Sequence, residues 1–168
     1  LFQIKVLLHQ IHYYMKKIFY FLSLLFIVTS CTEDIKFNNP AFQTLKDNVF
    51  WRANDYQAYS ETSGNIVIEG SLGYEKVILR IPSGTVQAYI VGIDNTTKAS
   101  YSNTFPQQLP EFTTGENRGS GQIVVTEYNT ETNTISGTFK LTALNEDETD
   151  TENPKVTFTE GVFYKVPV

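Results

Sequence analysis

The amino-acid sequence predicts an all-β domain, most simply an antiparallel sandwich of two sheets, preceded by a signal-peptide helix. After position 49, β-branched and aromatic residues dominate, and glycine, asparagine, aspartate and proline divide them into short runs. No segment there keeps the 3.6-residue period of an amphipathic helix. Uneven loop lengths and one-sided alternation favour the sandwich over the alternative, a small antiparallel barrel.

The N-terminal residues have the order of a signal peptide. Met15 is followed by Lys16 and Lys17, an uncharged apolar run over residues 18–28, and small residues before Cys31. The apolar run is about half of the roughly 20 residues that a membrane-spanning helix needs. We therefore interpret residues 1–14 as an upstream extension of the reading frame and residues 15–30 as a signal peptide.

Val28-Thr29-Ser30-Cys31 resembles the lipobox of bacterial lipoproteins, in which the cysteine thiol takes a diacylglyceryl group. The resemblance makes Cys31 the predicted lipid attachment residue and the membrane the first partner of the chain. We expect residues 31–48 to be the lipidated cysteine and a polar tether, with a short helix or irregular segment around residues 41–45. The all-β domain then covers residues 49–168.

The location of the lipoprotein follows from the residues behind the lipid site. The predicted compartment is the cell envelope, as an outer-membrane lipoprotein. Glu33 and Asp34 resemble a short form of the acidic signal that sends lipoproteins of the Bacteroidota to the cell surface. The alternative is that these two residues only begin a solvated tether, which leaves surface exposure open.

Composition excludes several classes of function. Ten Lys and Arg against 18 Asp and Glu give the chain from Cys31 onward a net charge of −8, the wrong sign for a nucleic-acid binder. Both histidines, His9 and His12, precede Met15, and Cys31 is the single cysteine. Histidine-based nucleophile pairs and zinc sites of His or Cys are therefore excluded from the mature chain, and we expect no cofactor.

The strands follow one another with short turns. The predicted strands are 49–53, 56–60, 65–70, 76–81, 85–91, 121–128, 134–144, 155–159 and 161–166, with a further short strand at 99–101 inside a long loop over residues 94–120. The clearest is 134–144, where Ile135, Phe139 and Leu141 share one face with Gly137, and polar residues share the other. Gly161 indicates a bulge between the last two strands.

Several segments together resemble a known family. They are Phe50–Ala53, Gly84–Tyr89, Ala99–Tyr101, Gly121–Thr126, Ile135–Phe139 and Val156–Phe163. They are similar to an uncharacterised lipoprotein family of the Bacteroidota, a domain of unknown function, whose members share the plan of lipobox, polar tether and a single all-β domain. The resemblance implies this fold and membrane anchoring, and it transfers no catalytic residue.

Three sets of residues are candidates for a site. Trp51, Tyr56 and Tyr59 could line a ligand face, although aromatic side chains in an all-β domain most often pack in the core. The loop containing Asp147, Asp150 and Glu152 offers carboxylate oxygens that Ca²⁺ prefers, yet it lacks the glycine of an EF-hand loop. Further carboxylates could form a hydrolytic pair, but no motif selects any two of them; these are Glu69, Glu75, Asp94 and Glu127.

The sequence therefore favours a non-catalytic lipoprotein, a monomer, that binds a protein or a glycan at the cell envelope. The runner-up is a structural or envelope-assembly component without a small ligand. A carboxylate-based hydrolase is the remaining alternative.

Overall fold

The computed structural model describes residues 12–17, 39–106 and 110–168. The chain divides into two compact units, Leu1–Asn38 and Asn39–Val168. Of the first unit, only the helical residues 12–17 are described. No helix in the described part of the chain is long and apolar enough to cross a membrane. Cys31 lies outside the described residues.

The second unit is built almost entirely from eleven strands, which confirms the predicted all-β class. Their bounds are β1 Ala41–Lys46, β2 Val49–Arg52, β3 Asp55–Ser60, β4 Ile66–Leu72, β5 Glu75–Ile81, β6 Ala88–Val91, β7 Lys98–Asn103, β8 Glu111–Thr113, β9 Ser120–Asn129, β10 Thr134–Asn145 and β11 Lys155–Pro167.

All strand pairs are antiparallel, and together they form one hydrogen-bonded sheet with the order β2-β1-β11-β10-β8-β7-β5-β4-β3. Strand β9 also pairs with β10, and β6 pairs with β9. Strand β10 joins the two halves because residues 134–142 pair with β9 while Leu144 and Asn145 pair with β8. The order is open, beginning at β2 and ending at β3.

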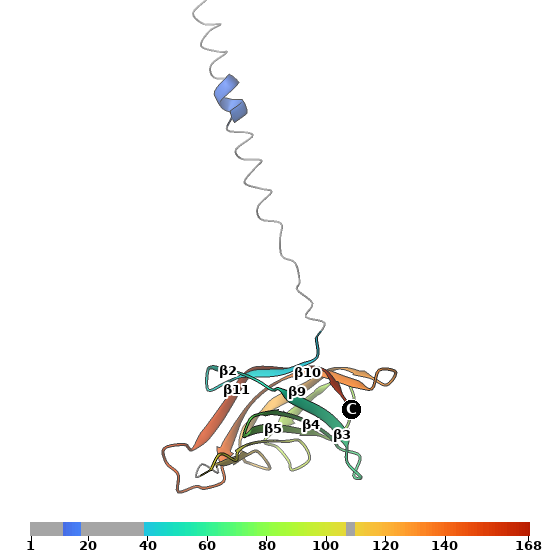
Figure 1. The fold of residues 1–168 in the computed structure, drawn as a ribbon, viewed down its shortest axis with the longest axis vertical. Coiled ribbons are helices and arrows are strands. Elements are labelled where there is room, and N and C mark those ends of the chain that lie inside the picture. The colour runs from blue at the N-terminus through green and yellow to red at the C-terminus, as the bar shows by residue number, and fades with distance from the viewer. Residues whose placement is uncertain (1–11, 18–38, 107–109) are drawn as a thin grey trace, which may run out of the picture. The chain divides into compact units, whose positions relative to one another are not determined.

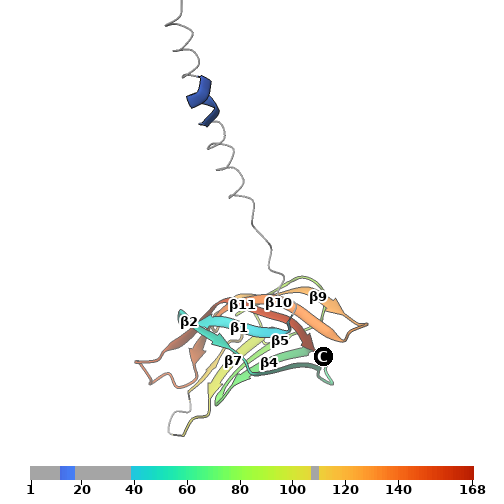
Figure 2. The same cartoon turned by 45° about the horizontal axis from the view of Figure 1, so that its top comes forward.

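The sheet curls so that its two halves face each other like the layers of a sandwich. Figures 1 and 2 show β1, β10 and β11 in one layer and β4 and β5 in the other. The rings of Tyr101 on β7 and Phe158 on β11 lie 5.7 Å apart across the layers. Gly70 on β4 leaves room for the ring of Phe42 on β1, which a Cβ atom would meet at 2.8 Å. The predicted two layers are thus confirmed, but they belong to one continuous sheet.

Strand β1 corrects the prediction of a tether with a short helix around residues 41–45. The segment pairs with both β2 and β11, and Phe42 is fully buried. The sequence pattern misled because Thr44 occupies an inward position where an apolar residue is expected. Its hydroxyl donates to the carbonyl oxygen of Thr159 at 2.9 Å, which satisfies the buried oxygen. The β unit consequently begins near Asn39 rather than at residue 49.

The predicted strands at 155–159 and 161–166 are one strand, β11, with a bulge between them. Glu160 takes a positive φ of 52°, and the register against β10 shifts between Phe139 and Leu141. The bulge predicted at Gly161 is therefore present, centred one residue earlier. The alternation predicted for β10 is confirmed, since Ile135, Phe139 and Leu141 are all buried.

The long loop predicted between residues 94 and 120 contains two strands, β7 and β8. Strand β7 extends the short strand predicted at 99–101, and β8, with only three residues, has too little alternation to be seen in the sequence. Strand β6 is shorter than the predicted 85–91 because residues 83–87 form a turn. The hydroxyl of Tyr89 stabilises this segment, because it lies within hydrogen-bond distance of the carbonyl oxygens of Ser83 and Thr85, at 2.8 and 3.0 Å.

Candidate functional site

A hollow of about 810 Å³ lies at one end of the sandwich and is here named the end groove. It lies between the β1–β2 turn, the beginning of β8 and the loop that joins β10 to β11. The lining residues are Lys46, Asp47, Tyr101, Pro110, Glu111, Phe112, Asn145, Glu146, Asp147, Asp150, Asn153, Lys155 and Val156. Figure 1 shows the β1–β2 turn and the β10–β11 loop at the same end of the molecule.

The β1–β2 turn is a two-residue connection, and both Asp47 and Asn48 take positive φ values, of 49° and 66°. This is the type I′ geometry that matches the twist of a hairpin, and Asp and Asn tolerate it better than other non-glycine residues. The turn is fastened to β11, because Asp47 N donates to Thr157 O at 2.8 Å and Asp47 Oδ1 accepts from Thr157 N at 2.9 Å. One wall of the groove is therefore firmly placed.

The opposite wall is organised by Asn145, which is only 6% exposed. Its Nδ2 donates to Asp150 Oδ2 at 3.2 Å and to Asn153 O at 2.9 Å, and its Oδ1 accepts from Asp147 N at 3.0 Å. One buried amide thus sets the path of the acidic loop. The hydroxyl and backbone N–H of Thr149 both donate to Asp147 and hold the pKa of that carboxyl below its ordinary value.

The predicted calcium loop uses its carboxylates for its own turns. Asp150 Oδ1 accepts from the backbone N–H groups of Glu152 and Asn153 at 3.1 and 2.9 Å, and Asp147 Oδ1 accepts from Thr149. Across residues 39–106 and 110–168, no three or more Asp, Glu, His or Cys side chains are grouped in a way that could hold a metal ion. Asp147 and Asp150 therefore shape the rim of the groove by charge and turn geometry.

Two lining residues of the groove, Lys46 and Tyr101, belong to a polar cluster with Trp51 and Glu75, here named the cross-layer cluster. Lys46 and Trp51 come from the β1–β2 hairpin, and Glu75 and Tyr101 come from β5 and β7 in the other layer. The Glu75 carboxylate accepts from Lys46 Nζ and Tyr101 OH on one oxygen and from Trp51 Nε1 at 2.9 Å on the other. Lys46 Nζ also donates to Tyr101 OH at 3.0 Å.

The surroundings of the cluster shift the pKa values of Glu75 and Tyr101. Burial raises the pKa of Glu75, but the hydrogen bonds from Lys46, Tyr101 and Trp51, with the ammonium charge, outweigh it and hold the pKa below its ordinary value. Burial, and then the neighbouring Glu75 carboxylate, raise the pKa of Tyr101 far above its ordinary value. Glu75 therefore stays ionised and Tyr101 stays protonated at neutral pH.

The structure separates the three aromatic candidates. Trp51 is 2% exposed and belongs to the core, with its indole N–H on Glu75. Tyr56 is half-buried against the same core, and its hydroxyl donates to Pro40 O at 2.9 Å. Tyr59 points to the outer face of β3 and is 43% exposed. The three side chains therefore do not share one face.

The four carboxylates considered for hydrolysis lie on separate parts of the unit. Glu75 faces the interior, whereas Glu69 on β4 faces outward, accepts from Gln57 at 2.6 Å and pairs with Lys76 at 3.6 Å. Asp94 accepts from the backbone of Thr96 and Thr97 in its own turn. Glu127 is an exposed residue of β9.

Sequence reasoning named Trp51 and Glu75 for other roles and missed Lys46, Tyr101 and Asn145. The hydrogen-bonded partners within the cross-layer cluster are 24 to 55 positions apart in the chain, so no local sequence pattern predicts them. Asn145 carried a weak signal, since it is a polar residue at the next inward step of the alternation through Leu141 and Ala143.

The comparisons with known proteins agree with the two-part organisation. Residues 38–167 match the family model described as Domain of unknown function (DUF6252), and residues 15–32 match the model of the prokaryotic membrane lipoprotein lipid attachment site. The second match begins at Met15 and includes Cys31, which supports the lipid attachment predicted there. No curated protein and no solved structure matches the chain significantly.

Proposed function

Because the chain belongs to the family described as Domain of unknown function (DUF6252) and carries a lipoprotein lipid attachment site, we propose that it is a non-catalytic, lipid-anchored binding module of the outer membrane, with the end groove as its binding face. The observation that carries the proposal is the position of this groove, a hollow of about 810 Å³ lined by five carboxylates, at the end of β1 opposite to Asn39.

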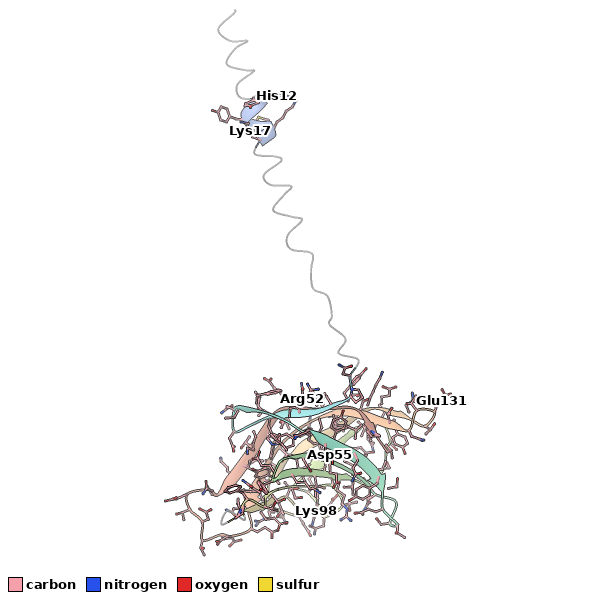
Figure 3. The ribbon with its side chains drawn as sticks, in the orientation of Figure 1. His12, Lys17, Arg52, Asp55, Lys98 and Glu131 are labelled. Carbon is pink, nitrogen blue, oxygen red and sulfur yellow. The ribbon has the colours of Figure 1, made fainter. Side chains whose placement is uncertain are left out.

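The length of strand β1 gives the distance between Asn39 and the end groove within the β unit. It runs from Ala41, next to the entry of the chain at Asn39, to Lys46, which lines the end groove. Five steps of about 3.4 Å place the two ends of the strand roughly 17 Å apart. The β9–β10 turn with Glu131 lies toward the entry end, as Figure 3 shows. The groove and Asn39, the first residue of the β unit, therefore lie toward opposite ends of β1.

The charges of the groove favour a protein partner with basic side chains. Five carboxylates line the groove, and they are Asp47, Glu111, Glu146, Asp147 and Asp150. Of the two lysines beside them, Lys46 already neutralises Glu75 and only Lys155 is left. These carboxylates accept hydrogen bonds from neutral N–H and O–H groups, which leave the negative charge in place. A net negative groove attracts and orients a cationic partner.

The absence of catalysis is part of the proposal. Residues 31–168 contain no histidine, and the best-placed carboxylate, Glu75, is held by three donors that its protonation would disturb. A general acid with a raised pKa is what glycoside hydrolysis requires, whereas the pKa of Glu75 is lowered. These features support a binding role over a hydrolytic one.

Site-specific photocrosslinking in living cells tests the proposal. A photoreactive side chain at Glu111, in the groove, is compared with one at Glu127, an exposed carboxylate of β9 outside it. We expect a discrete crosslinked protein from position 111 alone, which weakens or disappears in Glu146→Lys because one carboxylate of the groove is replaced by a positive charge. Equal labelling from both positions, or a band that Glu146→Lys leaves unchanged, would contradict the assignment.

The remaining hypotheses are distinguished by two further measurements. If the full-length protein bound glycans on an array and gave no protein crosslink, the proposed partner would be a carbohydrate and not a protein. Failure of both assays would favour the structural component. Protease shaving of intact cells tests the surface location, and complete protection of the β unit would place it on the inner leaflet.

A further inference from the structure

Strand β6, Ala88–Val91, is an edge strand whose free side is unusually open to pairing. It pairs with β9 on one side and has no partner strand on the other among the described strands. The described edges of the sheet are β2, β3 and β6. An unpaired strand edge presents a row of backbone donors and acceptors to any second strand that can align with it.

The hydrogen-bond pattern shows which groups of β6 face outward. The carbonyl oxygen of Gln87 accepts from Val125 N at 3.0 Å, so Gln87 is directed toward β9. In an antiparallel ladder this direction alternates, which turns the N–H and C=O groups of Tyr89 and Val91 toward β9 as well. The N–H and C=O groups of Ala88 and Ile90 consequently point to the free edge.

The side chains along this edge are apolar and uncharged. Val86, Ile90 and Ile93 are 61%, 46% and 65% exposed. Residues 82–93 contain no charged side chain, although 18% of the whole chain is charged. The other two edges carry charges that discourage pairing, Arg52 on β2 and Asp55 on β3 (both labelled in Figure 3).

We propose that the free edge of β6 pairs with β6 of a second copy of this chain, antiparallel and about a two-fold axis. The sequence alone favours a monomer, but it does not reveal that this uncharged segment is an edge. A two-fold axis places the same surface patch of both copies face to face, so a patch with a net negative charge would be repelled by its own copy. Nine Lys and Arg against 16 Asp and Glu give residues 39–168 a net charge of −7. The uncharged β6 edge avoids this repulsion.

Strand β6 is short, so the paired interface is small and forms only where the copies are concentrated. Four residues bury much less than the roughly 800 Å² per partner of a standard stable interface. The pair is therefore weak in dilute solution, and the lipid anchor makes it significant because it confines the copies to one surface at high effective concentration. Pairing is expected in the membrane and is lost on dilution in detergent.

Disulfide trapping of the full-length lipidated protein in vesicles tests the proposal. Cys31 carries the lipid, so single-cysteine variants Ala88→Cys and Ile90→Cys introduce one free thiol each. An axis at one of these positions places that residue opposite its own copy, and an axis between them places position 88 of one copy opposite position 90 of the other, which an equimolar mixture of the two variants tests. Facing residues of paired antiparallel strands have Cα atoms about 4.5–5.5 Å apart, within the range of a disulfide. We expect mild oxidation of one variant or of the mixture to give dimers in at least several-fold higher yield than Gln57→Cys, the matched control on the β3 edge.

Charge at the edge provides the second arm. Adding Val86→Lys to the cysteine variant that gives dimers should reduce the dimer to the yield of the Gln57→Cys control, and Ile90→Lys should do the same where position 90 is not the cysteine, because each copy then brings one ammonium group into the shared edge. An unchanged thermal midpoint of a lysine variant shows that its folding is intact. One lysine variant with an unchanged midpoint is enough for the test. Equal yields from the β6 and β3 cysteines, or dimers that survive both lysines, would overturn the proposal. The proposal would also be overturned if oxidation of the β6 cysteine variants in cells gave only crosslinks to a protein whose mass differs from that of this chain.

Discussion

The cross-layer cluster permits a quantitative prediction for Glu75→Gln. The substitution keeps the size of the side chain and replaces one acceptor oxygen by an NH₂ group. If the remaining oxygen serves Tyr101, the indole N–H of Trp51, which is 2% exposed, loses its acceptor. A hydrogen bond to a charged group contributes about 1.5–3 kcal/mol.

The charge of Lys46 adds a smaller cost. Its side chain is 23% exposed, so water solvates the ammonium group in part once the carboxylate is gone, and the ion-pair loss is below about 1 kcal/mol. The free energy of unfolding should therefore fall by about 2–3 kcal/mol. At roughly 3–4 °C per kcal/mol for a domain of this size, the thermal midpoint falls by about 8 °C.

Urea and thermal unfolding followed by Trp51 fluorescence measure the effect, since Trp51 is the single tryptophan. Glu127→Gln, an exposed carboxylate on β9, is the control and should change the free energy by less than about 0.5 kcal/mol. If Glu75→Gln were as stable as the control, the cluster would contribute no net stability and the reasoning would be refuted.

Three further predictions follow from the same structure. The lowered pKa of Glu75 means that the unfolded chain binds its proton more readily, so this contribution is complete above the ordinary value of 4.5 and is lost as the pH falls through the lower folded value. Urea midpoints between pH 3 and 7 should fall more steeply in the wild type than in Glu75→Gln, where only the other carboxyls of lowered pKa, such as Asp147, still contribute. Gly137→Ala should cost more than about 3 kcal/mol, measured by thermal melts, because its Cβ overlaps a backbone carbonyl and the ring of Phe163, whereas Gly73→Ala meets no atom within 4 Å and should cost only about 1 kcal/mol for its positive φ. Cys31→Ser should abolish incorporation of labelled palmitate, and persistent labelling would contradict the lipid assignment.

Much of the fold was predictable because its information is local. The alternation of β10 over residues 134–144 is visible in the sequence, and the residues predicted on its inner face are buried. Strand β1 was missed because Thr44 interrupts the alternation, and its hydroxyl is satisfied only by a bulge 115 positions away. The end groove was unpredictable for the same reason, since its walls come from hairpins that meet only when the sheet curls.

The sequence by itself determined the lipoprotein attachment site within residues 15–32, the all-β class and the absence of histidine from residues 31–168, because each depends on residue type and short spacing. The tertiary structure alone decided that Trp51 is a core donor, that Asn145 shapes the acidic loop, and that the uncharged residues around β6 form an open edge. These properties depend on which strands become neighbours. Strand pairing is a long-range choice, made by burial of the whole inner face of the sheet, and no short segment of the chain contains it.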